Sequence, residues 1–94
     1  MRVIVKFIGS LRNFFGERNK TFDCENGISI KELINHIITT KPTIKEILVS
    51  PQNDKFRLNS LILVNGTEIS VLNGLETKLS DGDEITLIPV IHGG

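Results

Sequence analysis

Two adjacent glycines, Gly93 and Gly94, are the last residues of this 94-residue sequence, and their type suits a chemical role. Glycine has no Cβ atom, so a Gly-Gly segment can enter a channel too narrow for any side chain. Such a segment presents one α-carboxyl group, which is an anion near neutral pH. The carbon of a carboxylate resists nucleophiles, so this group must be activated before it can react.

The usual activation makes the carboxylate oxygen attack the α-phosphate of ATP, and the resulting acyl-adenylate accepts sulfur or an amine. The chain itself offers no catalyst for this step. Its only histidines and cysteine, His36, His92 and Cys24, form neither a zinc site nor a convincing Cys-His pair. A separate adenylating enzyme is therefore required. The alternative is a glycine end with no role, and composition alone leaves both readings open.

Composition predicts one small domain and excludes several classes of function. Eleven basic and eleven acidic residues give no net charge, and Trp and Tyr are absent. Without a basic stripe or stacking aromatics, we expect no nucleic-acid binding. The longest aliphatic run, 61–64, is far shorter than the roughly twenty residues of a membrane span. A single cysteine permits no intramolecular disulfide, which favours a cytoplasmic location.

Alternating apolar residues predict a first strand over residues 1–7, with Val3, Val5 and Phe7 on the buried face. Glycines at both ends of 9–16 favour a turn of helix. A second strand is expected over 20–25, with Phe22 and Cys24 pointing inward, and Cys24 is interpreted as a small core residue.

The clearest helix begins at Ser29, because Ser29 and Glu32 have the spacing of a capping box. His36 falls on its polar side and is expected to be solvated. A second, shorter helix is expected from Thr43, with a box to Glu46, and segment 50–54 is expected to be a loop. The apolar stripe of the first helix is Ile30, Leu33, Ile34, Ile37 and Ile38.

The second half of the sequence is predicted to form β-strands. A strand over 61–64 that is apolar on both faces, a tight turn at Asn65-Gly66 and a partner strand over 68–72 form a predicted hairpin. A turn over 81–83 leads into a final strand over 84–90. The carboxylates Asp81, Asp83 and Glu84 are interpreted as turn chemistry rather than a calcium loop. This order predicts an α+β β-grasp fold, a mixed sheet curled around one main helix.

Residue parity also predicts an apolar patch beside the C-terminal tail. If Val3, Val5 and Phe7 pack under the helix, Ile4 and Ile8 face outward, together with Thr86, Ile88 and Val90 of the last strand. A partner protein buries surfaces of this kind. The alternative is that segment 43–60 covers the patch.

These residues resemble the MoaD and ThiS sulfur carriers, together with the ubiquitin-related modifiers and small archaeal modifiers. The resemblance covers nearly the whole chain and is weakest over 41–60. Four local patterns in the same order support it: an alternating first strand followed by Leu11-Arg12 and Gly16, the strand end Val64-Asn65-Gly66, the turn from Leu79 to Ile85, and Gly93-Gly94.

The resemblance implies a ubiquitin-like β-grasp domain over 1–94 with a flexible tail over 92–94. It implies that a ubiquitin-activating-type enzyme adenylates Gly94 with ATP and Mg²⁺ and that a sulfur donor then forms a thiocarboxylate. The chain would be a protein co-substrate, not an enzyme, with no bound cofactor or metal. The expected partner-binding residues are Gly93, His92, Ile91, Ile88, Val90, Ile4 and Ile8; for His92 an ordinary exposed position is the equal alternative.

The acceptor of the sulfur stays open at this point. A MoaD-like member is the small subunit of molybdopterin synthase, with the large subunit as partner, whereas modifier-like members serve tRNA thiolation. The length of the chain argues mildly against the thiazole synthesis of ThiS-like carriers, and the ending 91–94 looks more like the modifier branch. The alternative function is a ubiquitin-like modifier joined to lysines through Gly94. A third possibility is a plain binding module with an idle tail.

Overall fold

The computed structural model describes residues 1–50, 57–58 and 60–90. The strands are β1 (Arg2–Phe7), β2 (Asn19–Asp23), β3 (Val49–Ser50), β4 (Arg57–Leu58), β5 (Ser60–Val64), β6 (Thr67–Glu68) and β7 (Glu84–Pro89). The α-helices are α1 (Ser10–Phe15), α2 (Ile30–Thr40) and α3 (Lys45–Leu48), and 3₁₀ turns cover Pro42–Ile44, Ile69–Val71 and Gly74–Glu76.

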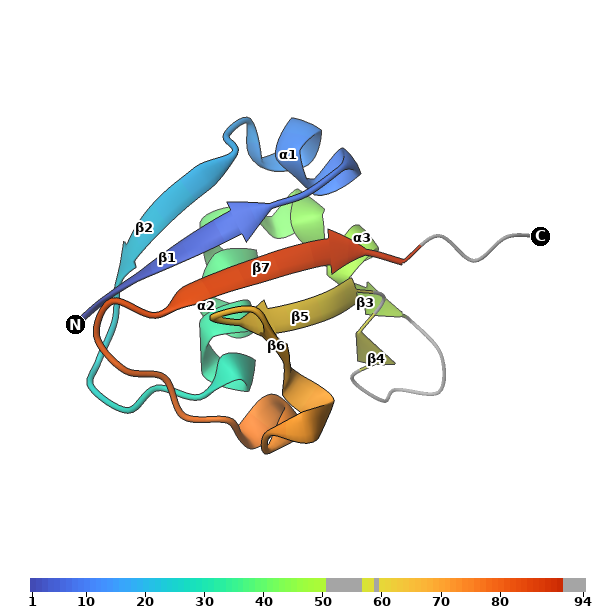
Figure 1. Ribbon diagram of the computed structural model, residues 1–94. Coiled ribbons are helices and arrows are strands. Elements are labelled where there is room, and N and C mark those ends of the chain that lie inside the picture. The colour runs from blue at the N-terminus through green and yellow to red at the C-terminus, as the bar shows by residue number, and fades with distance from the viewer. Residues whose placement is uncertain (51–56, 59, 91–94) are drawn as a thin grey trace.

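Five strands form a mixed sheet in the order β2-β1-β7-β5-β6. β1 and β7 are parallel, and the other neighbours pair antiparallel. α2 crosses one face of the sheet (Figure 1). The predicted α+β β-grasp fold is therefore confirmed.

The core lies between α2 and the inner face of the sheet. Val3, Val5 and Phe7 have no exposed surface, so the alternation predicted for the first strand is confirmed. Ile85 and Leu87 of β7 are equally buried, because β7 pairs in register with β1. Burying a side chain of this size contributes roughly 1.5–3 kcal/mol, so this inner face is the main source of stability.

The capping box predicted for the main helix is present. Glu32 N–H donates to Ser29 Oγ at 3.2 Å, and Ser29 N–H donates to Glu32 Oε1 at 3.2 Å. The apolar stripe behind this cap faces the core, with Ile38 only partly buried. Among the described helices, none has the length and apolar character needed to cross a membrane.

The capping box predicted at Thr43 is wrong. A 3₁₀ turn begins one residue earlier, at Pro42, and no side chain caps it. The fixed φ of proline suits the first position of a helical turn, so Thr43 lies inside the turn and its hydroxyl is not at the cap position. Two of the three residues expected to be buried here are in the core, Ile44 and Leu48, and the third, Ile47, is partly buried.

The hairpin after β5 is shorter than predicted. Its turn forms as expected, with φ values of 50° at Asn65 and 86° at Gly66, angles that the Asn-Gly pair favours. Only Thr67 and Glu68 then pair with β5, however. The Glu68 carboxylate accepts a hydrogen bond of 2.6 Å from Ser70 N–H and starts a 3₁₀ turn in place of the expected strand.

Two other boundaries differ from the sequence expectation, and one strand pair is additional. β2 ends at Asp23, so Cys24 lies just after the strand and is partly buried at the margin of the core. β7 ends at Pro89 rather than at 90. β3 and β4 form a short antiparallel pair that was not predicted. The predicted loop over 50–54 lies outside the described residues except for Ser50.

Candidate functional site

The chain leaves the sheet through β7, which lies between β1 and β5. β7 ends at Pro89 and Val90 is the last described residue. The predicted site residues Ile91, His92, Gly93 and Gly94 therefore lie outside the described part of the chain. Five residues, 90–94, follow the strand, and at full extension they span at most about 17 Å. Any enzyme that acts on Gly94 must close around this end of the sheet.

Four apolar residues form a surface at this end, on the sheet face opposite α2. We name it the tail-side patch: Ile8, Leu61, Ile88 and Val90. Leu61 is the cross-strand partner of Ile88, and Ile8 N–H donates to the carbonyl of Leu87 at 3.0 Å, beside Ile88. The exposed fractions are 36% for Ile8, 40% for Leu61 and 45% for Val90, so three large apolar side chains remain accessible around the exit of the tail.

Ile4 does not belong to this patch, although the sequence placed it there. Ile4 pairs with Glu84 at the beginning of β7, about 13 Å along β1 from Ile8 at the usual rise per residue. Between them Lys6 Nζ forms an ion pair of 3.0 Å with Glu84 Oε1 across the same face. Parity correctly predicted that both isoleucines point outward, but a charged pair separates them.

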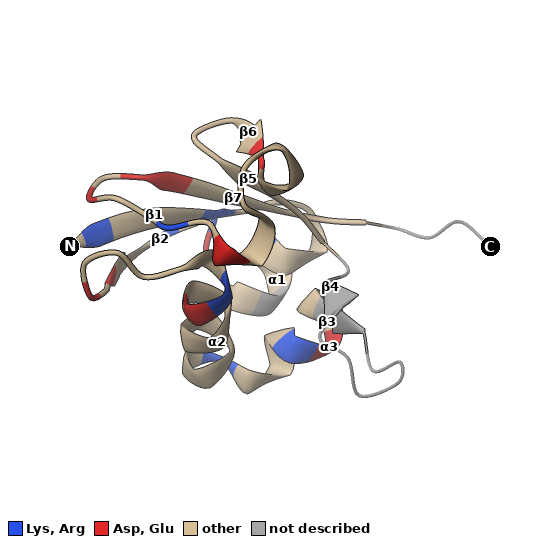
Figure 2. Ribbon diagram, turned by 90° about the horizontal axis from the view of Figure 1, so that it is seen from below, with Lys and Arg blue, Asp and Glu red and all other residues tan. Residues whose placement is uncertain are grey.

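Leu61 was missed as a candidate docking residue. Its signal was the apolar run over 61–64, which indicates a strand with apolar side chains on both faces. The register that places Leu61 beside Ile88 is a long-range feature. Figure 2 places α3 on the α2 side of the sheet. Residues 45–48 of segment 43–60 therefore do not cover the tail-side patch.

Gly9 shapes the sheet end from which the tail leaves. Its backbone angles are φ 60° and ψ −134°, a conformation almost confined to glycine. An added Cβ would lie 3.4 Å from Pro89 Cγ, so space is adequate and the backbone angle is the main cost. At this residue the chain turns from β1 into α1, directly beside the end of β7.

We expect Gly9→Ala to lower the free energy of unfolding by about 1–3 kcal/mol, measured by urea denaturation. The matched control is Gly16→Ala, since Gly16 has φ 84° and ψ 1°, a left-handed conformation that costs other residues only about 1–2 kcal/mol. A smaller loss for Gly9→Ala than for Gly16→Ala would contradict this view of the turn.

The carboxylates before β7 fix the start of that strand. Asp81 Oδ1 accepts a 2.7 Å hydrogen bond from Arg2 N–H. Asp83 Oδ1 accepts one of 2.9 Å from the side-chain amide of Asn65, whose oxygen in turn accepts from Glu84 N–H at 3.0 Å. These groups therefore hold the turn against β1 and the Asn65 hairpin, as the sequence predicted for this segment.

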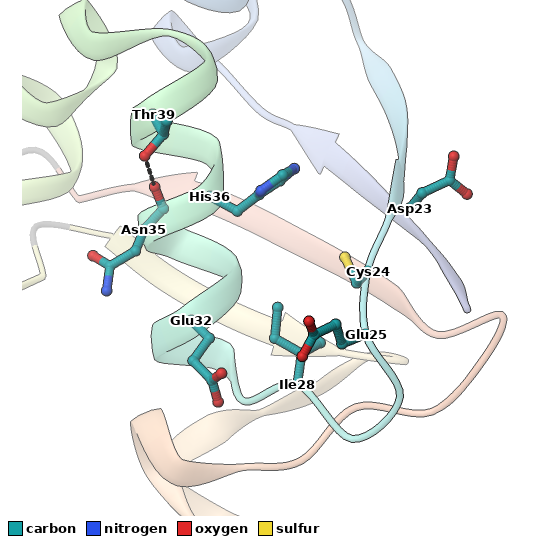
Figure 3. Close-up of a pocket in the computed structure, with 8 residues that line it drawn as sticks. All are labelled: Asp23, Cys24, Glu25, Ile28, Glu32, Asn35, His36 and Thr39. Carbon is teal, nitrogen blue, oxygen red and sulfur yellow. Dashed lines mark hydrogen bonds between the residues drawn. The ribbon is translucent and has the colours of Figure 1, made fainter.

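A hollow lies at the other end of the sheet, between the end of β2 and α2. It is a cavity of about 500 Å³ lined by Asp23, Cys24, Glu25, Ile28, Glu32, Asn35, His36 and Thr39. Figure 3 shows the Cys24 thiol and the His36 ring pointing into it. Burial raises the pKa of the Cys24 thiol, so it is protonated near neutral pH and is a poor nucleophile.

His36 is exposed, as predicted, yet its ring packs edge-on against Phe22 with the ring centroids 5.6 Å apart. Along the described ribbon, Lys and Arg positions are interspersed with Asp and Glu positions (Figure 2). The described residues therefore offer two surfaces of interest, the tail-side patch and the cavity beside β2.

Known proteins share this fold and sequence pattern. The model of the ThiS family matches residues 5–94. Ubiquitin-related modifier 1 of Saccharomyces cerevisiae is 28% identical over 98 residues, which cover 100% of this chain and 99% of the yeast protein. The solution structure of small archaeal modifier protein 1 from Methanosarcina acetivorans has a TM-score of 0.81 and 28% identity, over 99% of this chain and 96% of that one.

A third relative was solved together with a partner protein. CysO in the BexX/CysO complex of Amycolatopsis orientalis superposes with a TM-score of 0.73 at 27% identity, over 98% of this chain and 99% of that chain. The family match includes both Gly93 and Gly94, β7 and the tail-side patch. The chain belongs to the ThiS family, the small sulfur carriers and protein modifiers with a ubiquitin-like β-grasp fold.

Proposed function

We propose that this protein is a sulfur carrier of the ubiquitin-related-modifier type and that the α-carboxyl group of Gly94 carries the sulfur. One observation carries the proposal: the alignment with the yeast modifier covers this chain and that protein almost end to end, and the family model extends through Gly94. In this proposal residues 1–94 form one cytoplasmic domain, of which 92–94 form the reactive tail.

The chemistry takes place in partner enzymes. A ubiquitin-activating-type enzyme holds ATP and Mg²⁺, the Gly94 carboxylate attacks the α-phosphate, and pyrophosphate leaves. Sulfide released by a donor then attacks the carbonyl carbon, AMP leaves with the electron pair of its bond to that carbon, and the sulfide proton passes to solvent. The product is a thiocarboxylate. The chain is the co-substrate of these steps, not their catalyst, and holds no cofactor of its own.

The contribution of the chain is presentation of the tail. Gly93 has no side chain and so allows the tail to enter a narrow enzyme channel, and His92 and Ile91 contact the entrance of that channel. The tail-side patch supplies the docking surface, because it surrounds the point where the chain leaves the sheet and is apolar and accessible. Ile4 serves only partners that extend past the Lys6–Glu84 ion pair to the far end of the sheet.

The acceptor proposed first is tRNA, because the yeast relative belongs to the modifier branch, which the resemblance associates with tRNA thiolation. Transfer to a pterin by a molybdopterin synthase large subunit is the runner-up. A second fate of the same activated carboxyl is an isopeptide bond to lysine. Relatives in yeast and in an archaeon are protein modifiers by name, which favours keeping this fate.

Gene deletion in the native host tests the acceptor. We expect loss of thiolated uridine from tRNA, restoration by the full chain, and no restoration by a chain lacking Gly94. Loss of molybdopterin with unchanged tRNA thiolation would contradict the first choice and select the runner-up. High-mass conjugates that disappear with Gly94 while tRNA thiolation stays intact would select the modifier.

A further inference from the structure

β2 is an edge strand of the sheet, and half of its backbone faces away from β1. Met1 and Cys24 exchange two hydrogen bonds, of 2.9 and 2.8 Å, which fixes the alternation of the antiparallel pair. By this alternation Phe22 and Lys20 bond to their partners on β1, whereas Thr21 and Asp23 do not.

The other side of β1 confirms this assignment. Ile4 N–H, opposite Thr21, donates to the Asp83 carbonyl at 2.9 Å, and the Arg2 carbonyl, opposite Asp23, accepts from Gly82 N–H. The backbone N–H and C=O groups of Thr21 and Asp23 therefore point to the outer edge. Among the described residues, none pairs with that edge. Such an edge is a template for another strand.

The cavity beside β2 lies next to this open edge. On β2, Phe22 points to the α2 side and is 3% exposed, and Cys24 continues that parity into the cavity (Figure 3). A strand added along Thr21 and Asp23 would also direct alternate side chains to the α2 side, because side chains alternate along a strand. One of them would lie over the cavity.

The lining of the cavity favours a cationic side chain. Three of its eight residues are acidic and none is Lys or Arg. The Asp23 carboxylate points away and pairs with Arg2 at 3.0 Å. Glu25 and Glu32 also line the cavity. Hydrogen bonds from Ser29 and, to a smaller extent, the charge of Lys78 lower the pKa of Glu32, which keeps it anionic. Ile28 offers an apolar wall for an aliphatic stem.

We propose that the outer edge of β2 binds an extended peptide as an additional strand, with an Arg or Lys side chain of that peptide in the cavity between β2 and α2. Backbone hydrogen bonds to Thr21 and Asp23 give the register, and the acidic cavity gives the preference for a basic residue. This combination of a sheet edge and a side-chain pocket is a known mode of peptide recognition.

The peptide site is separate from the tail. Cys24 bonds to Met1 at the start of β1, and β7 runs parallel to β1, so Val90 lies at the opposite end of the sheet. Figure 1 shows the N-terminus and the end of β7 on opposite sides of the molecule. A basic peptide can thus bind while the tail is in an enzyme. This peptide site does not depend on the proposed function of the tail.

Amide hydrogen exchange by NMR, with a designed probe, tests the inference. The probe is a capped heptapeptide of alternating threonine and valine with arginine at its centre, and the control peptide has glutamate in place of arginine. At ten times Kd of the arginine peptide, we expect exchange at the Thr21 and Asp23 amides to slow about tenfold. The Lys20 and Phe22 amides, which already bond to β1, serve as internal controls. The glutamate peptide should bind at least about fivefold more weakly.

Two protein variants separate backbone pairing from charge. Thr21→Pro removes an outward N–H and leaves the bonds to β1 in place, and we expect at least about tenfold weaker binding; Thr21→Val keeps the N–H and should bind normally. The double variant Glu25→Gln, Glu32→Gln should bind the arginine peptide about fivefold more weakly. Its binding of the glutamate peptide should not become weaker. Adenylation of the tail should be unchanged in all these variants.

Three results would overturn the inference. The first is unchanged exchange at Thr21 and Asp23 at saturating peptide. The second is equal binding of the arginine and glutamate peptides. The third is protection of the same amides in the absence of peptide, if this protection increases with protein concentration and sedimentation shows a dimer. The edge would then pair with a second copy of this chain.

Discussion

Deletion of Gly94 is expected to lower the rate of carboxyl activation by at least roughly 100-fold, since a displacement of about 1 Å at a reacting centre can cost that much. Removing one residue draws the carboxylate back by about 3.5 Å along an extended tail. The measurement is ATP-dependent pyrophosphate release with the cognate adenylating enzyme, under conditions of limiting carrier protein.

The control for this variant is its fold. The urea midpoint of the shortened chain should equal that of the full chain, because the core lies between α2 and the sheet. Gly94→Ala is a matched second variant: it keeps the tail length but adds a Cβ, and it should also activate poorly if the channel is narrow. Activation of the shortened chain at the full rate would contradict the assignment of Gly94 as the reacting residue.

Ile88→Asp is expected to reduce kcat/KM for adenylation about 30-fold, chiefly through KM. A residue at the centre of an interface typically contributes about 2 kcal/mol or more, and 2 kcal/mol corresponds to about 30-fold in affinity. Ile88 occupies such a central position, because Leu61 lies across from it on β5 and Ile8 lies beside it on the β1 side.

Two matched variants locate the docking surface. Val71→Asp introduces the same charge at a 72% exposed residue outside the tail-side patch, and it should leave adenylation unchanged. Ile4→Asp lies on the same sheet face but beyond the Lys6–Glu84 ion pair, and we expect at most a threefold effect, about the size of a peripheral contact. An unchanged rate for Ile88→Asp, with an intact fold by circular dichroism, would end the docking proposal.

Much of the fold was predictable because its signals are local. The alternation of Val3, Val5 and Phe7 requires only a strand with one buried face, and both capping hydrogen bonds between Ser29 and Glu32 come from residues three apart. The Asn65-Gly66 turn likewise follows from the angles that these two residues tolerate. Each of these predictions is confirmed.

The errors arose where one local signal competes with another. Thr43 has the spacing of a capping residue, but Pro42 starts the turn first. Segment 68–72 has strand-like residues, but the Glu68 carboxylate captures Ser70 N–H and turns the backbone into a 3₁₀ turn. The periodicity of apolar residues does not show which of two competing local interactions will form.

The candidate site was only partly predictable because strand register is a long-range property. Parity gave the outward direction of Ile4, Ile8 and Ile88, but the pairing of Ile4 with Glu84 and of Leu61 with Ile88 decides which of them meet. The open edge of β2 follows from the strand order for the same reason. The role of Gly94 stays a prediction from the sequence and the family.

Top-down mass spectrometry of the protein purified from its own host tests the central claim most directly. The account predicts a population in which one oxygen is replaced by sulfur, with fragment ions that place the change at Gly94. An active protein that extends beyond Gly94, or that has been trimmed before it, would contradict the account.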